Sequence, residues 1–172
     1  MCVSSNEGIC EIGEERFQEA AKLLSEALWD FDGACPEDFE LLLCSTRRTA
    51  QRVFAVFSED GMMRGVAVWR FYDLYADGSM ELSLAWIAVA SDSQRHGLGS
   101  HLLRESLRMF LRNPEFANRG VAYIIAESEK DNKGAIAFHR RVLGFPEETT
   151  RGRRVYFLST VEKVLNPKGV PA

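Results

Sequence analysis

The chain has 172 residues, of which 46% are hydrophobic and 27% charged, and its net charge is −4. This length and composition predict one globular domain over residues 1–172. The acidic balance without a long basic run argues against nucleic-acid binding, and no apolar run approaches the length of a membrane span, about 18 to 20 residues.

The N-terminal segment and the cysteines point to a cytoplasmic protein. The first residues, MCVSSNEGICEIGEE, lack a basic segment followed by an apolar one, so we expect no signal peptide. None of the cysteines has C-x-x-C spacing or a neighbouring histidine, and we interpret them as free thiols, with a metal or disulfide role as the alternative. They are Cys2, Cys10, Cys35 and Cys44.

The N-terminal third favours helices. Apolar residues at helical spacing predict a helix over Glu14–Trp29 and a shorter one over Glu37–Cys44. The first is interrupted at Asp32 and Gly33, and Pro36 suits the start of the second.

The rest of the chain favours strands. β-Branched and aromatic runs between turn residues predict strands that alternate with two further helices. The predicted strands are Val53–Phe57, Gly65–Tyr72, Met80–Ala90, Val121–Glu127 and Arg153–Val161. Turns are expected at Asp60-Gly61, at Asp77-Gly78 and over Thr149–Gly152, and residues 166–172 are expected to be frayed.

One stretch has the order strand, glycine loop, helix. The apolar run Leu84–Ala90 is followed by the polar turn Ser91–Ser93 and by the loop QRHGLG, residues 94–99. An amphipathic helix follows. Its apolar face is predicted to hold Leu102, Leu103, Leu107, Phe110 and Leu111.

This order predicts an anion site. The first amides of a helix have no partner within it, and the helix dipole places about half a positive charge there. Gly97 and Gly99 lack a Cβ, so a phosphate can approach the backbone and a positive φ is allowed. Arg95 adds a cation. The stretch is not a P-loop, because G-x-x-x-x-G-K-[ST] is absent, and it is not a Rossmann fingerprint, because Leu102 stands where the third glycine would be.

Two motifs in this order resemble those of the GNAT acetyltransferase superfamily. Gln94-x-x-Gly97-x-Gly99 is similar to the family's Q/R-x-x-G-x-G/A signature, which binds the pyrophosphate of acetyl-CoA. The segment from Asn132 through Ala135, Phe138 and His139 to Gly144-Phe145 resembles the family's N-x-x-A-x-x-[FL]-Y…G-F segment. The resemblance covers roughly residues 53–158.

The resemblance implies a GNAT-like α/β (α+β) fold: a mixed, mostly antiparallel twisted sheet flanked by helices, with a splayed central strand pair. That pair would be the strands Met80–Ala90 and Val121–Glu127, with the pantetheine arm of acetyl-CoA entering between them. The backbone of Ile87, Ala88 and Val89 would pair with this arm and polarise the thioester carbonyl.

The resemblance also assigns further acetyl-CoA contacts. The pyrophosphate would lie on the loop and on the first turn of the helix, and the pantetheine arm on the second motif. The loop residues are Gln94, Arg95, His96, Gly97, Leu98, Gly99 and Ser100, and those of the second motif are Asn132 and Phe138. Asn132 is equally explained as a helix N-cap, and Phe138 as core.

Two residues are candidate catalytic groups. Acyl transfer to an amine needs a base, and the family's usual positions on this strand are occupied by Ser83 and Ala85, which do not titrate usefully. Glu81 is on the same strand face and is the predicted substitute, acting directly or through water. His139 occupies the place of the family's tyrosine, which protonates the departing thiolate, although Phe138 to Gly144 holds one residue more than usual. Plain surface or helix-face roles are the alternatives for both.

Acceptor clues come from an acidic cluster flanked by aromatic residues, which would attract a cationic amine. It consists of Asp30, Asp32, Glu37, Asp38 and Glu40, beside Trp29, Phe31 and Phe39. Favourable charges near a helix start explain it equally well.

The sequence therefore predicts a cytoplasmic N-acetyltransferase that uses acetyl-CoA and no metal, by direct attack of a primary amine. Its partners would be acetyl-CoA and the amine, and a homodimer is left open. A non-catalytic acyl-CoA-binding sensor and a transferase for longer acyl chains are the rival hypotheses.

Overall fold

The computed structural model describes residues 8–32, 35–45, 51–73, 79–116, 119–144 and 146–166. The chain divides into two compact units, residues 1–69 with 86–113 and residues 70–85 with 114–172, and each is described by itself. No helix in the described parts is long and apolar enough to cross a membrane.

The strands of the described residues are β1 (Ile9–Glu11), β2 (Gln51–Phe57), β3 (Met63–Asp73), β4 (Met80–Val89), β5 (Val121–Glu129), β6 (Glu147–Arg151) and β7 (Arg154–Ser159). They are hydrogen-bonded in the order β1-β2-β3-β4-β5-β7-β6. The pairs β1–β2, β5–β7 and β6–β7 are antiparallel, whereas β4–β5 is parallel. β3 and β4 each continue from one unit into the other. The predicted mixed, mostly antiparallel sheet flanked by helices is therefore confirmed.

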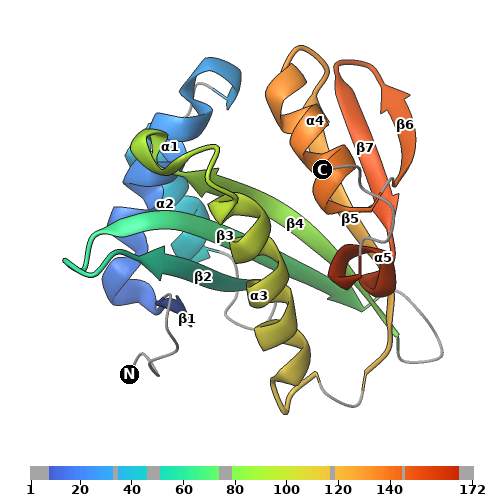
Figure 1. Ribbon diagram of the computed structural model, residues 1–172, viewed down its shortest axis with the longest axis horizontal. Coiled ribbons are helices and arrows are strands. Elements are labelled where there is room, and N and C mark those ends of the chain that lie inside the picture. Colours follow the sequence, from blue (N-terminus) through green and yellow to red (C-terminus); the bar gives the residue numbers. More distant parts are fainter. Residues whose placement is uncertain are drawn as a thin grey trace. The chain divides into compact units, whose positions relative to one another are not determined.

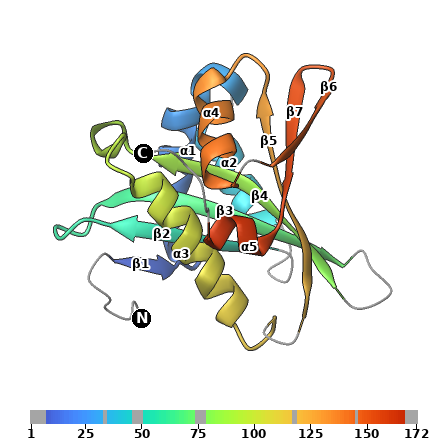
Figure 2. The ribbon, with the colours of Figure 1, turned by 45° about the vertical axis from the view of Figure 1, so that its right-hand side comes forward.

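The first unit contains three helices around the strands β1–β3 and the end of β4. In chain order its elements are β1 (Ile9–Glu11), η1 (Glu14–Arg16), α1 (Phe17–Asp32), α2 (Pro36–Ser45), β2 (Gln51–Phe57), β3 (Met63–Asp73), β4 (Met80–Val89), η2 (Ser91–Ser93) and α3 (Leu98–Arg112). α3 packs against β1 and β2, and α1 packs against α2. In two views α3 lies in front of the strands and α2 behind them (Figures 1 and 2).

A buried hydrogen bond ties α3 to β3. The Trp69 indole nitrogen donates to the Ser106 hydroxyl at 2.8 Å, and that hydroxyl donates to the Leu103 carbonyl at 3.1 Å. Four of the five predicted apolar residues of α3 are buried, but Leu111 is only half-buried. Ser106 is fully buried on this face, because its hydroxyl satisfies the indole of a fully buried tryptophan.

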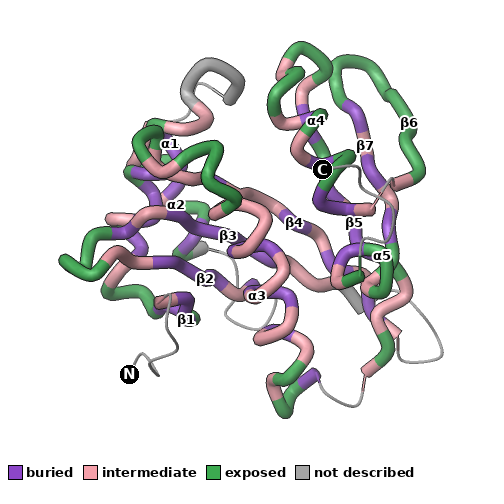
Figure 3. Tube along the Cα trace, viewed as in Figure 1, coloured by how far each residue is buried: buried purple, intermediate pink, exposed green. Residues whose placement is uncertain are grey.

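The described part of the second unit has two α-helices that contact antiparallel strands. Its elements after β4 are β5 (Val121–Glu129), α4 (Lys133–Val142), β6 (Glu147–Arg151), β7 (Arg154–Ser159) and α5 (Val161–Leu165). α4 contacts β5 and β7, and α5 contacts β5. Figure 3 shows β6 exposed along its length, whereas β7 alternates between buried and half-buried residues after Arg154.

Several predicted boundaries are wrong in this unit. Thr149–Arg151 belong to β6 and only Gly152 and Arg153 form the turn, because an edge strand with polar residues on both faces shows no alternating pattern. The last strand ends at Ser159, since the Thr160 hydroxyl accepts from the Lys163 amide and starts α5. The short α5 was also missed, as was the three-residue β1 of the first unit.

Some predictions lie outside the described residues. They concern Cys2, the break at Gly33, the turn at Asp77-Gly78, Phe145 of the second motif and the tail beyond Asn166. The remaining predicted helices and strands are present, with ends shifted by a few residues.

Candidate functional site

The predicted anion loop lies in the first unit, between β4 and α3. β4 ends at Val89, the turn η2 follows, and Gly97 is the N-cap of α3 in a left-handed conformation with φ of 82°. No side chain caps this helix start. The strand–loop–helix order is therefore confirmed, and the amides at the start of α3 have no partner within the helix.

Residues 94–97, which lead into α3, are exposed. Arg95 adopts φ of 66°, which is unusual for a residue with a side chain. Gly97 has open space where a Cβ would be. Gly99, by contrast, lies in the first turn of α3, so positive φ is used at Gly97 and not at Gly99.

The side chains of the loop differ in what they do. The Gln94 amide donates to the Val89 carbonyl at 3.0 Å, so it closes the loop over the end of β4. Arg95 and His96 are exposed, and Leu98, Gly99 and Ser100 are half-buried in the first turn. The loop thus presents backbone amides together with the cationic side chain of Arg95.

The strand leading into the loop has an incomplete ladder. The register of β4 with β5 runs from Met80↔Val121 to Leu84↔Ala126, yet β4 continues to Val89 and β5 to Glu129. Ile87 and Val89 are half-buried, and Ala88 is buried. The described ladder therefore ends before the three residues that are predicted to pair with the pantetheine arm.

Glu81 lies in the second unit, within the paired part of β4. Met80, Leu82 and Leu84 are buried while Glu81 and Ser83 are half-exposed, as strand alternation predicts. Partial burial raises the pKa of the Glu81 carboxyl above its ordinary value, because the charged form loses hydration. A carboxylate with a raised pKa is a better proton acceptor near neutral pH.

His139 lies on α4 and is only 5% exposed. Its ring is 5.2 Å from that of Phe157 and 5.6 Å from that of Phe138. Among the buried side-chain nitrogen and oxygen atoms of the described residues, His139 Nδ1 is the one with no hydrogen-bond partner. Burial lowers the pKa of His139 to about 4, so the ring is neutral at pH 7.

The other residues of the second motif have visible structural roles. Asn132 caps α4, its side-chain oxygen accepting from the Ala135 amide at 2.9 Å. Phe138 is half-buried. Gly144 adopts φ of 67°, and a Cβ there would lie 2.6 Å from the Lys163 carbonyl oxygen. This glycine thus permits the close approach of the α4 end to α5.

The predicted acceptor cluster is described only in part. Asp38 caps α2, accepting from the Cys35 amide and thiol, both at 3.1 Å, and these bonds lower the pKa of its carboxyl. Phe39 is core, edge-on to Trp86 with ring centroids 5.7 Å apart. The side chains of residues 29–32 lie outside the described residues.

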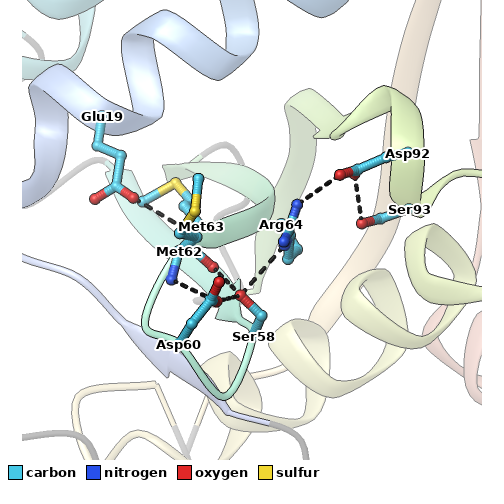
Figure 4. A network of polar contacts seen from close by, with 8 residues as sticks. All are labelled: Glu19, Ser58, Asp60, Met62, Met63, Arg64, Asp92 and Ser93. Atoms are coloured by element: carbon cyan, nitrogen blue, oxygen red, sulfur yellow. Dashed lines mark hydrogen bonds and ion pairs between the residues drawn. The ribbon is translucent and has the colours of Figure 1, made fainter.

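Sequence reasoning missed one residue beside the loop, Arg64. It is the second residue of β3, and its guanidinium contacts Asp92 of η2 (Figure 4). An isolated arginine in a strand carries no motif, so nothing in the sequence distinguishes it.

Neither a metal cluster nor a described cavity coincides with these residues. Within the described ranges, no group of three or more His, Cys, Asp or Glu side chains is placed to hold a metal ion. A cavity of about 430 Å³ in the first unit is bordered by β1, η1, β2 and the end of α2, and it contains none of the predicted site residues.

Comparison with known proteins identifies the family. The sequence model of the acetyltransferase (GNAT) family matches residues 18–145. No curated protein matches the sequence. Among solved structures, an aminoglycoside acetyltransferase from an uncultured soil metagenomic sample, in complex with sisomicin, has 20% identity and a TM-score of 0.65, covering 85% of this chain and 93% of its own.

Two further structures are similar. An aminoglycoside N-acetyltransferase in complex with CoA has 18% identity and a TM-score of 0.65, over 88% of this chain and 95% of its own. A ribosomal-protein-alanine N-acetyltransferase from Brucella melitensis has 22% identity and a TM-score of 0.61, over 87% and 96%. At these identities the likeness is one of fold.

Proposed function

Because the chain belongs to the acetyltransferase (GNAT) family, we propose that this acyltransferase moves an acetyl group from acetyl-CoA to a primary amine by direct attack. The observation that carries the proposal is the uncapped start of α3 at a left-handed Gly97, which follows β4 and the short turn η2. Such a start binds a phosphate group through backbone amides and the helix dipole.

The donor would be held by backbone groups. The diphosphate would lie on the amides of Gly97, Leu98, Gly99 and Ser100, with Arg95 and His96 beside it and Gln94 holding the loop closed. The pantetheine arm would pair with Ile87–Val89, where the described β4–β5 ladder has ended. Asn132 and Phe138 would contact the arm from the second motif. Together these contacts would orient the thioester for attack.

Glu81 would act as the base. The attacking amine must lose a proton, and a carboxylate whose pKa is raised by burial accepts one more readily than an ordinary glutamate. A Glu81 oxygen would take a proton from the ammonium nitrogen, directly or through water, which leaves the neutral amine to attack. As the C–N bond forms and the C–S bond breaks, the nitrogen would lose a second proton, which balances the thiolate that departs.

His139 would stabilise the departing thiolate by a hydrogen bond. With its pKa lowered to about 4, the imidazolium is nearly absent at pH 7, so the ring would act in its neutral form through an N–H. The unpartnered buried Nδ1 supports a polar partner that arrives with the substrate.

The acceptor would be a cationic amine. The exposed acids Glu37 and Asp38 at the start of α2 favour a positively charged substrate. The similar structures include an aminoglycoside acetyltransferase in complex with sisomicin and a ribosomal-protein-alanine N-acetyltransferase, so small amines and peptide N-termini should both be tried.

The test is acetylation of an amine panel with release of CoA thiol as the readout. Turnover with at least one amine is expected. Glu81→Gln should lower kcat about a hundredfold at pH 7, the usual size of a lost general base, and should remove the acidic limb of the pH–rate profile. His139→Phe should lower kcat about tenfold with little change in the acetyl-CoA KM. Unchanged kcat in both variants would contradict the assigned roles.

A non-catalytic acyl-CoA sensor is the second candidate, and the non-titrating Ser83 and Ala85 favour it. CoA binding without turnover for any amine of the panel would establish it. Absence of both binding and turnover would contradict both functions.

A further inference from the structure

The polar network around Arg64 lies entirely in the first unit and includes Asp92 and Ser93, which directly precede the loop over residues 94–100, here called the diphosphate loop (Figure 4). Arg64 is the second residue of β3, directly after the β2–β3 turn. Its backbone carbonyl accepts from the Ala90 amide at 2.9 Å, at the point where β4 ends and the turn η2 begins. The backbone of Arg64 therefore already fixes where the loop departs from the sheet.

The Arg64 side chain bridges two turns. One guanidinium nitrogen donates to the Asp92 carboxylate at 2.7 Å, and Nε donates to the Ser58 hydroxyl at 3.2 Å. The Arg64 side chain is 26% exposed and that of Asp92 is 64% exposed, so the pair is shielded at its Arg64 end and open to solvent at its Asp92 end. A planar guanidinium can make both bonds at once.

The far side of this bridge is itself held in place. The Ser58 hydroxyl donates to the Met62 carbonyl at 3.1 Å and contacts Asp60. The Met63 amide donates to the Glu19 carboxylate of α1 at 3.0 Å. The β2–β3 turn is thus tied both to itself and to α1, and it gives Arg64 a fixed support.

The near side holds the start of the loop. The second Asp92 oxygen accepts from the Ser93 hydroxyl at 2.9 Å, and the Ser93 amide donates to the Ala90 carbonyl at 2.9 Å. These contacts define η2. Arg95 and Gly97 follow, both with positive φ. This conformation is energetically costly at Arg95, which is not glycine, and it persists where neighbouring contacts fix the backbone.

Charge neutralisation is a second way in which the Arg64–Asp92 ion pair would favour binding of a diphosphate. Asp92 is the only acid between Ala90 and Arg104. An unpaired carboxylate in this segment would oppose a diphosphate at the loop, and the Arg64 guanidinium neutralises it. The same carboxylate has its pKa lowered, first by the Ser93 hydrogen bond and then by Arg64.

We propose that Arg64 is a positioning residue for the diphosphate loop: by joining Asp92 to Ser58 it fixes and neutralises the turn from which the loop begins. It would thereby set the affinity for the CoA diphosphate without touching the reacting atoms. This inference rests on the proposed function, because it concerns the same donor site.

The test compares acetyl-CoA with S-acetylpantetheine, a donor that has the same thioester but no diphosphate. Arg64→Ala should raise the acetyl-CoA KM about tenfold, with kcat and the amine KM within twofold, and it should leave the S-acetylpantetheine KM unchanged. Arg64→Lys keeps the charge but lacks the planar guanidinium that reaches both turns, so it should restore only the part of the affinity that depends on neutralising Asp92. In the double variant with Asp92→Asn, the effect should be no larger than that of Arg64→Ala alone.

Arg52→Ala is the matched control. Arg52 is also a mostly buried arginine of the first unit, but it lies on β2 and pairs with Glu11 at 3.2 Å. It should lower thermal stability without changing the acetyl-CoA KM. Circular dichroism establishes that each variant is folded, and Arg64→Lys and Asp92→Asn serve if Arg64→Ala does not fold.

The proposal is overturned if folded Arg64 variants bind acetyl-CoA normally, or if the KM values of both donors rise alike. Wild-type protein that neither binds nor uses either donor would instead overturn the proposed function, and this inference with it. If wild type binds acetyl-CoA and substitution of Arg64 does not change this binding, only the proposal for Arg64 fails and the proposed function stands.

Discussion

The loop over residues 94–100 and the helix α4 contain the two motifs that identified the family, yet they are built differently. The loop is exposed and presents backbone amides, and it depends on the left-handed conformation of Gly97. We propose that Arg64 supports this conformation from outside the loop. α4 presents a buried side chain, His139, whose surroundings remove its charge. A site built from backbone depends on conformation, whereas a site built from a side chain depends on desolvation, so the two should fail under different changes.

The largest expected effect concerns α4 and pH. The pKa of His139 falls from 6.5 to about 4 on folding, so the unfolded chain binds more protons between these values. The stabilising contribution of the neutral ring is fully present above pH 6.5 and is lost as the pH falls towards 4, by about 3 kcal/mol in total. Urea unfolding at pH 4.5 and pH 7 measures this difference.

His139→Phe is the control for this prediction, because it keeps an aromatic ring without a titratable group. Its stability should change less than that of wild type between the two pH values. An identical pH dependence in both proteins would show that the buried ring does not titrate as described.

The second effect concerns the loop conformation. Gly97→Val places a β-branched residue at φ of 82°, which costs about 2 kcal/mol, and about thirtyfold in acetyl-CoA KM if the loop changes shape to avoid it. Gly152→Val is the matched control, because Gly152 also has positive φ and open space but lies in the β6–β7 turn. It should lower stability and leave the acetyl-CoA KM unchanged. Equal KM values for the two variants would contradict a conformational role of Gly97.

A third, smaller effect concerns how α3 is held. Ser106→Ala leaves the buried Trp69 indole nitrogen without its hydroxyl acceptor and should lower the free energy of unfolding by about 1.5 kcal/mol. Chemical denaturation measures it. Ser106→Thr keeps a hydroxyl, so it should be more stable than Ser106→Ala if the hydroxyl is the stabilising group. No loss in Ser106→Ala would contradict this anchoring.

The smallest effect separates the two interpretations of Asn132. Asn132→Ala removes the cap of α4 and should cost about 1 kcal/mol, whereas Asn132→Ser keeps a capping oxygen and should cost less. If Asn132 also contacts pantetheine, both variants should raise the acetyl-CoA KM. A KM that follows stability alone would leave Asn132 as a cap only.

The sequence predicted what depends on local pattern. Gly97 next to a strand and an amphipathic helix was sufficient to predict the loop, and Asn132 was sufficient to predict the start of α4. These features need only a few consecutive residues, so periodicity and capping rules reach them.

What the sequence did not predict depends on tertiary contact. Ser106 on the buried face of α3 is explained only by its distant partner Trp69, and Arg64 only by Asp92. β6 was missed because a polar edge strand is defined by its pairing with β7. The loss of charge at His139 follows from burial among aromatic rings, which no spacing rule reports.

The most direct test of the central claim is a backbone amide NMR titration of the protein with CoA and, separately, with pantetheine. We predict that the amides of Gly97, Leu98, Gly99 and Ser100 shift with CoA and stay in place with pantetheine, because only CoA carries the diphosphate. Saturable CoA binding that leaves these four amides unshifted would contradict the account.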